Sequence, residues 1–425
     1  MHVRTGRLGM LKQAAWWGSV SVAAACIALS GARADVTSDQ AAAILVFPKL
    51  VVDTSVPPET ARGPVDTLIR VSNTSDRPIT MWCFYVNATP HCTNGTGSCL
   101  STPVTCSPIG ACKAEWQESD FVVSITARQP IAWLASQGAV LCQENDNPAV
   151  PCLPLSASGR PGPKGQNNDG SRISPVPEDP FIGELKCIAV DQNNVPVERN
   201  DLKGEAEIIR STATSIDVEG YNAVGVPAIL GLNAIWNGDN TLVLGGSCNG
   251  GANSGLPCSN ASSCPGGTCA AEYSSCPNIL ILDHFFDGAL DPISQRQVTT
   301  DLTLVPCSED FATQVPLTTT VQFLVFNEFE QRLSTSRPVT CFQEFHISDI
   351  DKASKDRSIF SAAVQGTLTG QTRIRGVADQ DQAHGHALLG VAEEFRADAG
   401  SAAVNLHFQG IRPQSDFIHL PAGGL

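Results

Sequence analysis

The sequence contains two passages in which short β-type segments follow one another in the same order. Each passage has a strand ending at proline, a strand leaving through Val-x-Asn, and a segment Arg-Pro-[Ile/Val]-Thr that leads to Cys-Phe. The two passages are residues 45–48, 67–73 and 77–84, and residues 304–306, 320–327 and 337–342. This repetition predicts a duplicated β-sandwich. Because such a scaffold hosts many unrelated functions, the repeat constrains the architecture more than the activity.

Strand-type segments also dominate the rest of the chain. They are short, rich in Val, Ile, Thr and Phe, and bounded by Gly, Pro, Asn and Asp, as in residues 121–126, 183–190 and 279–282. Side chains alternate between the faces of a strand, so Ile79, Met81 and Cys83 are expected on one face. Many short strands separated by turn residues predict an all-β fold.

Length and repetition together predict the domain organisation. A chain of 425 residues is longer than one hydrophobic core usually serves. We therefore predict two antiparallel, Ig-like β-sandwich domains, at residues 35–290 and 291–425. Disulfide-braced loop insertions are expected in the first domain.

Residues 1–34 have the features of a cleaved secretion signal. A positively charged start precedes a mostly apolar run at residues 14–29, and Ala-Arg-Ala at residues 32–34 forms a cleavage site. The mature chain is then expected to begin at Asp35 and to be secreted, periplasmic or attached to the cell surface. An alternative places a lipid on Cys26 after three alanines.

The charge of the chain excludes one large class of partners. The formal net charge is −15, and removal of the four basic residues of the signal takes it to −19. Those residues are Arg4, Arg7, Lys12 and Arg33. Nucleic acids and anionic lipids bind clustered basic side chains, so neither is an expected partner. The mature sequence has no apolar run near the ~18 residues of a membrane-spanning helix.

Cysteine is abundant for an exported chain. The sequence has 16 cysteines, and 15 remain once Cys26 leaves with the signal. In an oxidising compartment these predict disulfides, although their connectivity does not follow from sequence. Cys83 and Cys341 occupy matching positions in the two passages. We predict the pairs Cys83–Cys187 and Cys307–Cys341, each joining two strands.

Three stretches have the composition of insertions. One is the Gly/Ser/Thr/Pro-rich segment 92–112 with four cysteines, and another is the segment 153–180, which is poor in apolar residues. The third, residues 245–276, carries five cysteines and lacks apolar residues for a core of its own. Its Cys-Pro-Gly-Gly-Thr-Cys at residues 264–269 resembles small Cys-rich segments of secreted multidomain bacterial proteins.

Metal binding has two candidate sites in the sequence. His384 and His386 would share a face on a strand, but a zinc or copper site needs three or four converging donors. Exposed loop histidines explain this pair more simply. Asp349, Asp351 and Asp356 are loosely spaced like calcium ligands, although the glycine and terminal glutamate of a helix-flanked calcium loop are not in place. The sequence therefore predicts no bound cofactor and leaves calcium as an open alternative.

Catalytic motifs are not convincing. Asp283, His284 and Asp287 lie close together, but no Gly-x-Ser-x-Gly elbow frames a nucleophile. His-Glu-x-x-His and the Gly-x-x-x-x-Gly-Lys-[Ser/Thr] phosphate loop are also absent. We therefore expect a protein that is not an enzyme. A metal-dependent hydrolase centred on His384 and His386 is the least favoured alternative.

Tryptophans offer the best candidates for ligand contact. Trp133 alternates with Ile131 and is expected in the core, where tryptophan is usually largely buried. Trp116 and Trp236 have more polar neighbours and could stack on sugar rings. They predict a carbohydrate-binding module as an alternative function.

These general features resemble uncharacterised secreted bacterial proteins built from Ig-like or fibronectin-like β-sandwiches. The resemblance implies a non-enzymatic structural or adhesive role at the cell surface or in the periplasm. Its implied partners are a surface polysaccharide or another surface protein.

Overall fold

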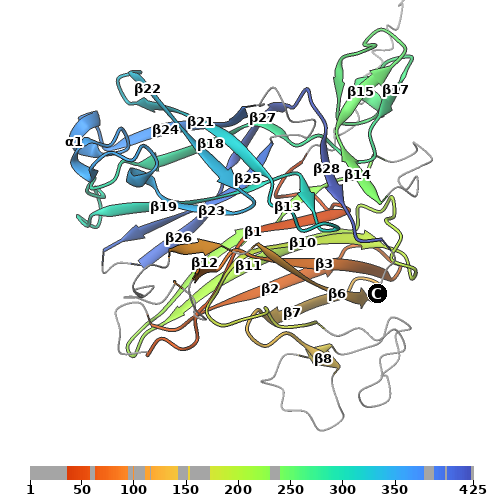
Figure 1. The fold of residues 1–425 in the computed structure, drawn as a ribbon, viewed down its shortest axis with the longest axis horizontal. Coiled ribbons are helices and arrows are strands. Elements are labelled where there is room, and N and C mark those ends of the chain that lie inside the picture. The colour runs from red at the N-terminus through yellow and green to blue at the C-terminus, as the bar shows by residue number, and fades with distance from the viewer. Residues whose placement is uncertain are drawn as a thin grey trace, which may run out of the picture. The chain divides into compact units, whose positions relative to one another are not determined.

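The computed structural model describes most of the chain as β-structure. It describes residues 36–57, 63–93, 99, 111–114, 116–141, 152–153, 173–229, 240–377, 387–397 and 400–422. Within these ranges the fold is nearly all β, with several antiparallel sheets (Figure 1), which confirms the predicted all-β class. The helices there are single turns: η1 (Ala261–Ser263), η2 (Ile347–Asp349), η3 (Lys355–Arg357) and α1 (Ala362–Gln365).

The helices of the described ranges are all too short and too polar to cross a membrane. The predicted secretion signal, residues 1–34, lies outside the described residues.

The first half of the chain supplies two antiparallel sheets. The first outer sheet has the order β12 (Ile216–Asn222), β11 (Leu202–Ser211), β2 (Val65–Asn73) and β7 (Pro130–Leu134). The first inner sheet has the order β13 (Val224–Val226), β1 (Ile44–Val52), β10 (Phe181–Val190), β3 (Ile79–Asn87) and β6 (Gln117–Ile125).

A shared apolar core lies between these two sheets. Strand β2 alternates buried and half-exposed residues, and its buried Ile69 and Val71 belong to the same core cluster as β1, β3 and β10. Trp133 is fully buried, which confirms its predicted core position, and its indole N–H donates to the Tyr85 hydroxyl at 2.9 Å. That bond satisfies the polar atoms of two large buried side chains.

The second half supplies another pair of antiparallel sheets. The second inner sheet has the order β23 (Gln343–His346), β19 (Val298–Pro306), β25 (Leu388–Arg396) and β26 (Gly400–Asn405). The second outer sheet has the order β22 (Arg332–Thr340), β21 (Thr318–Asn327), β24 (Thr369–Val377), β18 (Pro277–Phe285) and β27 (His407–Ile411). Phe323, Phe345 and Phe360 meet edge-on in the core between them.

The central strands of the first inner sheet are covered on both faces. Every residue of β10 is buried, and β1 and β3 are buried almost throughout. The core cluster of the first half extends to Val305, Leu389 and Val391 of the second inner sheet. A sheet with two covered faces has near-continuous buried strands instead of an alternating pattern. The two halves therefore share one packed interior.

Smaller sheets complete the fold. They are β14 (Thr241–Leu244) with β28 (Asp416–His419) and β20 (Glu309–Asp310); β16 (Pro257–Cys258) with β15 (Gly246–Asn249) and β17 (Thr268–Ala270); β4 (Pro90–Cys92) with β5 (Cys112–Ala114); and β8 (Val140–Leu141) with β9 (Cys152–Leu153). The C-terminal strand β28 pairs antiparallel with β14 and parallel with β20. It joins segments far apart in the chain.

The two repeated passages form different pairings. In the first passage, β2 and β3 lie in opposite sheets of the pair. In the second passage, β21 and β22 are neighbours in one sheet and pair along their whole length. The similar sequences therefore do not build equivalent arrangements.

The repeated Val-x-Asn exit has the same local role in both passages. The Asn73 side chain accepts the Ser75 N–H at 3.0 Å, and the Asn327 side chain accepts the Phe329 N–H at 3.0 Å. Both asparagines are buried. An asparagine that bonds backbone two residues on shapes a turn, so the repeat reflects shared turn chemistry.

The disulfides agree with one predicted pair and contradict the other. Cys83 and Cys187 are bonded, as predicted, across the directly paired strands β3 and β10. Cys307 is bonded to Cys276, and Cys341 is a buried free thiol, so the predicted Cys307–Cys341 pair is wrong. Cys341 follows the end of β22 with a φ of 48°, and its sulfur accepts the Leu317 N–H.

The predicted domain boundary between residues 290 and 291 stays a prediction. Strand β18, before that point, pairs with β24 and β27 after it. Strand β28, near the C-terminus, pairs with β14 of the earlier segment.

The disulfide pattern predicts a specific result in thiol labelling. Without reductant, Cys341 should react with iodoacetamide in denaturant but not in the folded protein, because it is buried and unbonded. A non-reducing digest should also yield a peptide joining Cys276 to Cys307. Recovery of Cys341 in a disulfide with Cys307 would contradict the structure.

Candidate functional site

Of the four ligand and metal residues predicted from sequence, the structure describes one, Trp116. Trp236, His384 and His386 lie outside the described residues. Trp116 precedes β6, is half-buried against the first core and has a φ of 53°. It is not among the residues that line the clefts described below. The carbohydrate and metal predictions for these four residues stay predictions.

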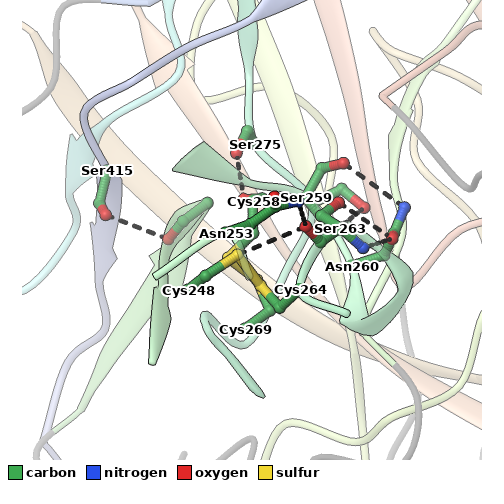
Figure 2. Close-up of a disulfide and its surroundings, with 12 residues drawn as sticks. Cys248, Asn253, Cys258, Ser259, Asn260, Ser263, Cys264, Cys269, Ser275 and Ser415 are labelled. Carbon is green, nitrogen blue, oxygen red and sulfur yellow. Dashed lines mark hydrogen bonds between the residues drawn. A yellow bond between two sulfur atoms is a disulfide. The ribbon is translucent and has the colours of Figure 1, made fainter. Parts of the chain in front are cut away.

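A Cys-rich lobe, residues 246–270, is held by disulfides (Figure 2). Cys248 bonds to Cys264, and Cys258 bonds to Cys269. Three of these sulfurs form the one group of possible metal ligands found in the described residues. Because their sulfurs are consumed in disulfides, they are not thiolates and offer no metal site.

Hydrogen bonds attach the lobe to the sheets beside it. The Ser275 hydroxyl donates to the Cys258 carbonyl at 2.8 Å, and the Ser415 hydroxyl donates to the Gly245 carbonyl at 3.1 Å (Figure 2). The Cys276–Cys307 disulfide follows the lobe and ties its base to the second inner sheet. The lobe is therefore fixed at its base.

The Asp283, His284 and Asp287 group does not converge. His284 is buried, its ring lies 2.8 Å from the Thr372 hydroxyl, and burial lowers its pKa to about 4. It is a neutral core histidine. Asp283 points to the opposite, exposed face of β18, as strand alternation requires. Asp287 contacts His346 instead.

The aspartates considered for calcium have local structural roles or are exposed. Asp351 accepts the backbone N–H of Ala353 at 3.1 Å and that of Ile359 at 2.7 Å. Its carboxylate therefore holds a loop together. Asp349 and Asp356 are exposed, and in the described part of the chain these three do not form a group within ligand distance.

An inter-sheet cleft of about 1060 Å³ opens between the two halves. It is lined by side chains of both signs, by hydroxyl groups and by one half-buried aromatic ring. Those that define its chemistry are Lys49, Arg210, Asp217, Asp301, Glu344, His346, Phe395, Arg396 and Ser401. The volume is at the upper end of ordinary ligand sites.

Three residues of the cleft lining belong to an interface ion cluster, defined here as Lys49, Arg210, Glu219, Glu344 and Glu393. Lys49 on β1 pairs with Glu344 on β23 and Glu393 on β25. Arg210 on β11 pairs with Glu219 on β12 and lies 3.4 Å from Glu393. Lys49 therefore bridges strands of the two halves, and Arg210 lies between a carboxyl group of the first half and one of the second. The cluster satisfies the charges that packing the sheets would otherwise leave unpaired.

Burial and neighbouring charges shift the pKa values of Glu219 and Glu393, the two most buried carboxyl groups of the cluster, in opposite directions. Burial raises the pKa of Glu219 to about 8, and the nearby Glu393 carboxylate adds to the shift. Burial also opposes ionisation of Glu393, but Lys49, a hydrogen bond from Glu219 and Arg210 together hold the pKa of Glu393 below its usual value. Glu393 is thus the ionised partner of Lys49, and Glu219 is the carboxyl group of the two that takes up a proton more readily.

His346 bridges two aspartates beside the cleft. Its Nδ1 lies 2.9 Å from Asp301 and its Nε2 lies 3.2 Å from Asp287. The Ser348 hydroxyl donates to Asp287 at 2.8 Å, so it does not face the imidazole as a nucleophile would. Hydrogen bonds to both aspartates raise the pKa of His346 to about 9. The group is a structural ion pair, and Lys355 also faces Asp287.

A second cavity, the sheet-face groove, has a volume of about 800 Å³ and lies on the second outer sheet. Gln371 donates to Asp283 at 3.1 Å, and Arg373 donates to Gln371 at 3.2 Å. The Arg373 guanidinium lies 5.5 Å from the centre of the Phe326 ring. A carboxylate, an amide, a guanidinium and an aromatic ring thus line one groove on rigid strands.

Comparison of the chain with protein-family models, with curated proteins and with solved structures finds no match. Function is therefore argued from the residues themselves.

Sequence reasoning named Asp283 and His284, which line the sheet-face groove, but missed the residues of the inter-sheet cleft and the rest of the groove. Lys49 has charged partners at residues 344 and 393, and no local spacing connects positions so far apart. One signal was available: Lys49, Glu184 and Lys186 are charged residues within otherwise apolar strand segments. A charge in a buried strand requires a partner, so these residues mark where another part of the chain must pack.

The His346 geometry predicts a pH-dependent stability. The folded pKa of about 9 exceeds the ordinary value of 6.5, so the folded state binds more protons between those pH values. This contribution to the free energy of unfolding is complete below pH 6.5 and is lost as pH rises through about 9. Urea unfolding at pH 6, 8 and 10 should show the loss in the wild type.

The matched control is His346→Gln, which keeps polar groups of similar size but does not titrate. The difference in stability between the two proteins should be largest near pH 6, shrink as the pH rises from 6.5 to about 9, and stay constant above that. An unchanged difference across this range would contradict the assigned ion pair.

Proposed function

We propose that the protein is an exported, non-enzymatic structural or adhesive protein of the periplasm or cell surface. One observation carries this proposal: the two inner sheets pack together through a common interior that is reinforced by buried ion pairs and a disulfide. Disulfides in the described residues are consistent with an oxidising compartment. Placement in the periplasm or at the cell surface is part of what we propose.

The proposed architecture is a pair of Ig-like sandwiches, each formed by one outer and one inner sheet. Such sandwiches are scaffolds whose connections carry the binding surfaces. The buried charges between the inner sheets support a fixed geometry between the halves, because separating them would expose or unpair those groups.

The Cys-rich lobe is the proposed adhesive element. Its disulfides replace the apolar core that it lacks, and its base is tied to the sheets. Leu256 on the lobe is 54% exposed. A small lobe held by cystines loses little conformational entropy on binding, which favours its use as a recognition surface. The expected partner is a surface polysaccharide or another surface protein.

Retention on isolated cell envelopes tests the adhesive role. Leu256→Asp should weaken retention of the mature protein about tenfold, the effect of ~1.4 kcal/mol of lost binding free energy. Leu290→Asp is the matched control, because Leu290 is also an exposed leucine, at 46%, but lies outside the lobe. Equal retention of both variants, or none by the wild type, would contradict the proposal.

Carbohydrate binding is a second candidate, favoured by the sheet-face groove. Phe326 supplies a ring and Asp283, Gln371 and Arg373 supply hydrogen-bonding groups within one groove. Sugar recognition combines an apolar ring face with hydrogen bonds to hydroxyl groups, and few polar groups set the orientation of a ligand in its site.

A glycan array separates this candidate from the first. If the groove binds sugar, Phe326→Ala and Arg373→Ala should each weaken binding to the best glycan about tenfold, or ~1.4 kcal/mol. Arg375→Ala is the control, because Arg375 is an exposed arginine on the same strand outside the groove lining. Loss of binding only in Trp116→Ala would place the sugar site at Trp116 and exclude the groove.

A further inference from the structure

The most unusual group in the interior is a buried lysine triad, defined as Glu184, Lys186 and Glu309. Glu184 and Lys186 lie on β10 and are 0% exposed, and Glu309 on β20 is 6% exposed. Residues 184 and 186 share one face of β10 because side chains alternate along a strand. That face lies against the second half of the chain, where Glu309 is located.

Lys186 is hydrogen-bonded to both carboxyl groups of the triad. Its Nζ lies 2.6 Å from Glu309 Oε2 and 2.9 Å from Glu184 Oε1. The fold therefore holds the amine nitrogen beside the carboxyl group with which it would react.

The surroundings of the triad are apolar and aromatic. Lys186 Nζ lies 5.9 Å from the centre of the Phe311 ring, and Phe311 stacks on Phe84 with ring centres 4.2 Å apart. All of these side chains are buried. In such an environment charged groups are costly to bury.

The other buried lysine provides a contrast. Lys49 also contacts two carboxylates, but Arg210 stands beside them and the group lines the inter-sheet cleft. Lys49, Arg210 and Glu344 line that open cavity. The residues of the triad line neither cavity described above, and Lys186 has no arginine beside its two carboxyl partners in the described structure.

We propose that Lys186 and Glu309 form an intramolecular amide bond, with Glu184 as the group that transfers protons. The bond would join β10 of the first inner sheet to β20 of the second half. It would be a covalent modification formed once, after folding has brought the three residues together.

The reaction balances without an external reactant. A proton moves from the Lys186 ammonium to the Glu309 carboxylate within their hydrogen bond, which gives a neutral amine and a neutral acid. The amine lone pair attacks the carboxyl carbon of Glu309, and a C–N bond forms. Glu184 gives its proton to the departing hydroxyl group, the C–O bond breaks, and water leaves. Glu184 then takes the proton from the nitrogen.

The protonation states support these roles. Burial raises the pKa of Glu184 to about 8, aided by Glu309 and opposed by Lys186, so Glu184 takes up a proton more readily than an exposed glutamate. The pKa of Lys186 is also raised, because the attraction of the two carboxylates outweighs burial. The free amine therefore arises by proton transfer inside the triad and not by loss of a proton to water.

Two physical terms favour the product. Holding the amine against the carboxyl group corresponds to effective concentrations of ~10⁵–10⁸ M for well-oriented reactions. Amide formation also replaces a buried ammonium and a buried carboxylate by one neutral group, which removes their desolvation cost. The released water leaves an apolar site that offers it few partners.

Mass spectrometry of the purified, fully reduced and alkylated mature protein tests the proposal. The intact mass should be lower, by one water molecule, than the mass calculated for the reduced and alkylated sequence. A protease digest should contain a branched peptide in which the residue 186 side chain is joined to that of residue 309. A wild-type protein of unmodified mass, or a branch to Glu184, would overturn the proposal.

Matched variants assign the roles. Lys186→Arg keeps the positive charge but its guanidinium is a poor nucleophile, so this variant should show the full sequence mass. Lys49→Arg changes the other buried lysine in the same way and should keep the deficit. Glu184→Gln should leave freshly made protein unlinked, because it cannot transfer the proton. A deficit that persists in Lys186→Arg would also overturn the proposal.

This inference is independent of the adhesive and carbohydrate proposals. The mass readout requires no ligand, and its failure would leave both of them unaffected.

Discussion

Packing of the two inner sheets against each other is the constraint on which the rest of the structure depends. Together with the small sheet of β14, β28 and β20, whose buried apolar residues belong to the same core cluster, it leaves every residue of β10 and nearly all of β1 and β3 buried, and one apolar core extends across both halves of the chain. Neither half alone could exclude water from these strands, because each would expose a full apolar sheet face to solvent. The halves therefore form one interior, and the C-terminal strand β28 returns to the earlier segment at β14.

The same packing gives the buried charges their importance. Lys49 and Lys186 occupy strands that are otherwise apolar, and each finds two carboxylates across or beside the interface. A buried pair of this kind contributes little net stability compared with apolar packing, but it penalises any arrangement that leaves a charge alone. The charges thus fix how the sheets meet. One site is open to a cleft, whereas the other is enclosed by aromatic rings, and this difference separates a structural ion cluster from a candidate reaction site.

Sequence predicted best where the relevant physics is local. Side-chain alternation predicted that Cys83 and Trp133 lie in the core, and the structure confirms both positions. The matching of Cys341 to Cys83 was wrong because it assumed that similar segments have similar partners. β22 pairs within the outer sheet while β3 pairs within the inner sheet, so the two cysteines meet different neighbours. What the repeat does preserve is the turn formed by Asn73 and by Asn327.

The sequence alone determined the all-β class, the strand positions and the richness in cysteine, because period-two alternation, turn residues and composition act over a few neighbouring residues. The tertiary structure decided which cysteines bond, which strands are buried on both faces and which charges meet. Cys276 finds Cys307, and Lys186 finds Glu309 at a separation of 123 residues. Such contacts depend on how four sheets stack, and stacking is set by the summed packing of many side chains that no local pattern records.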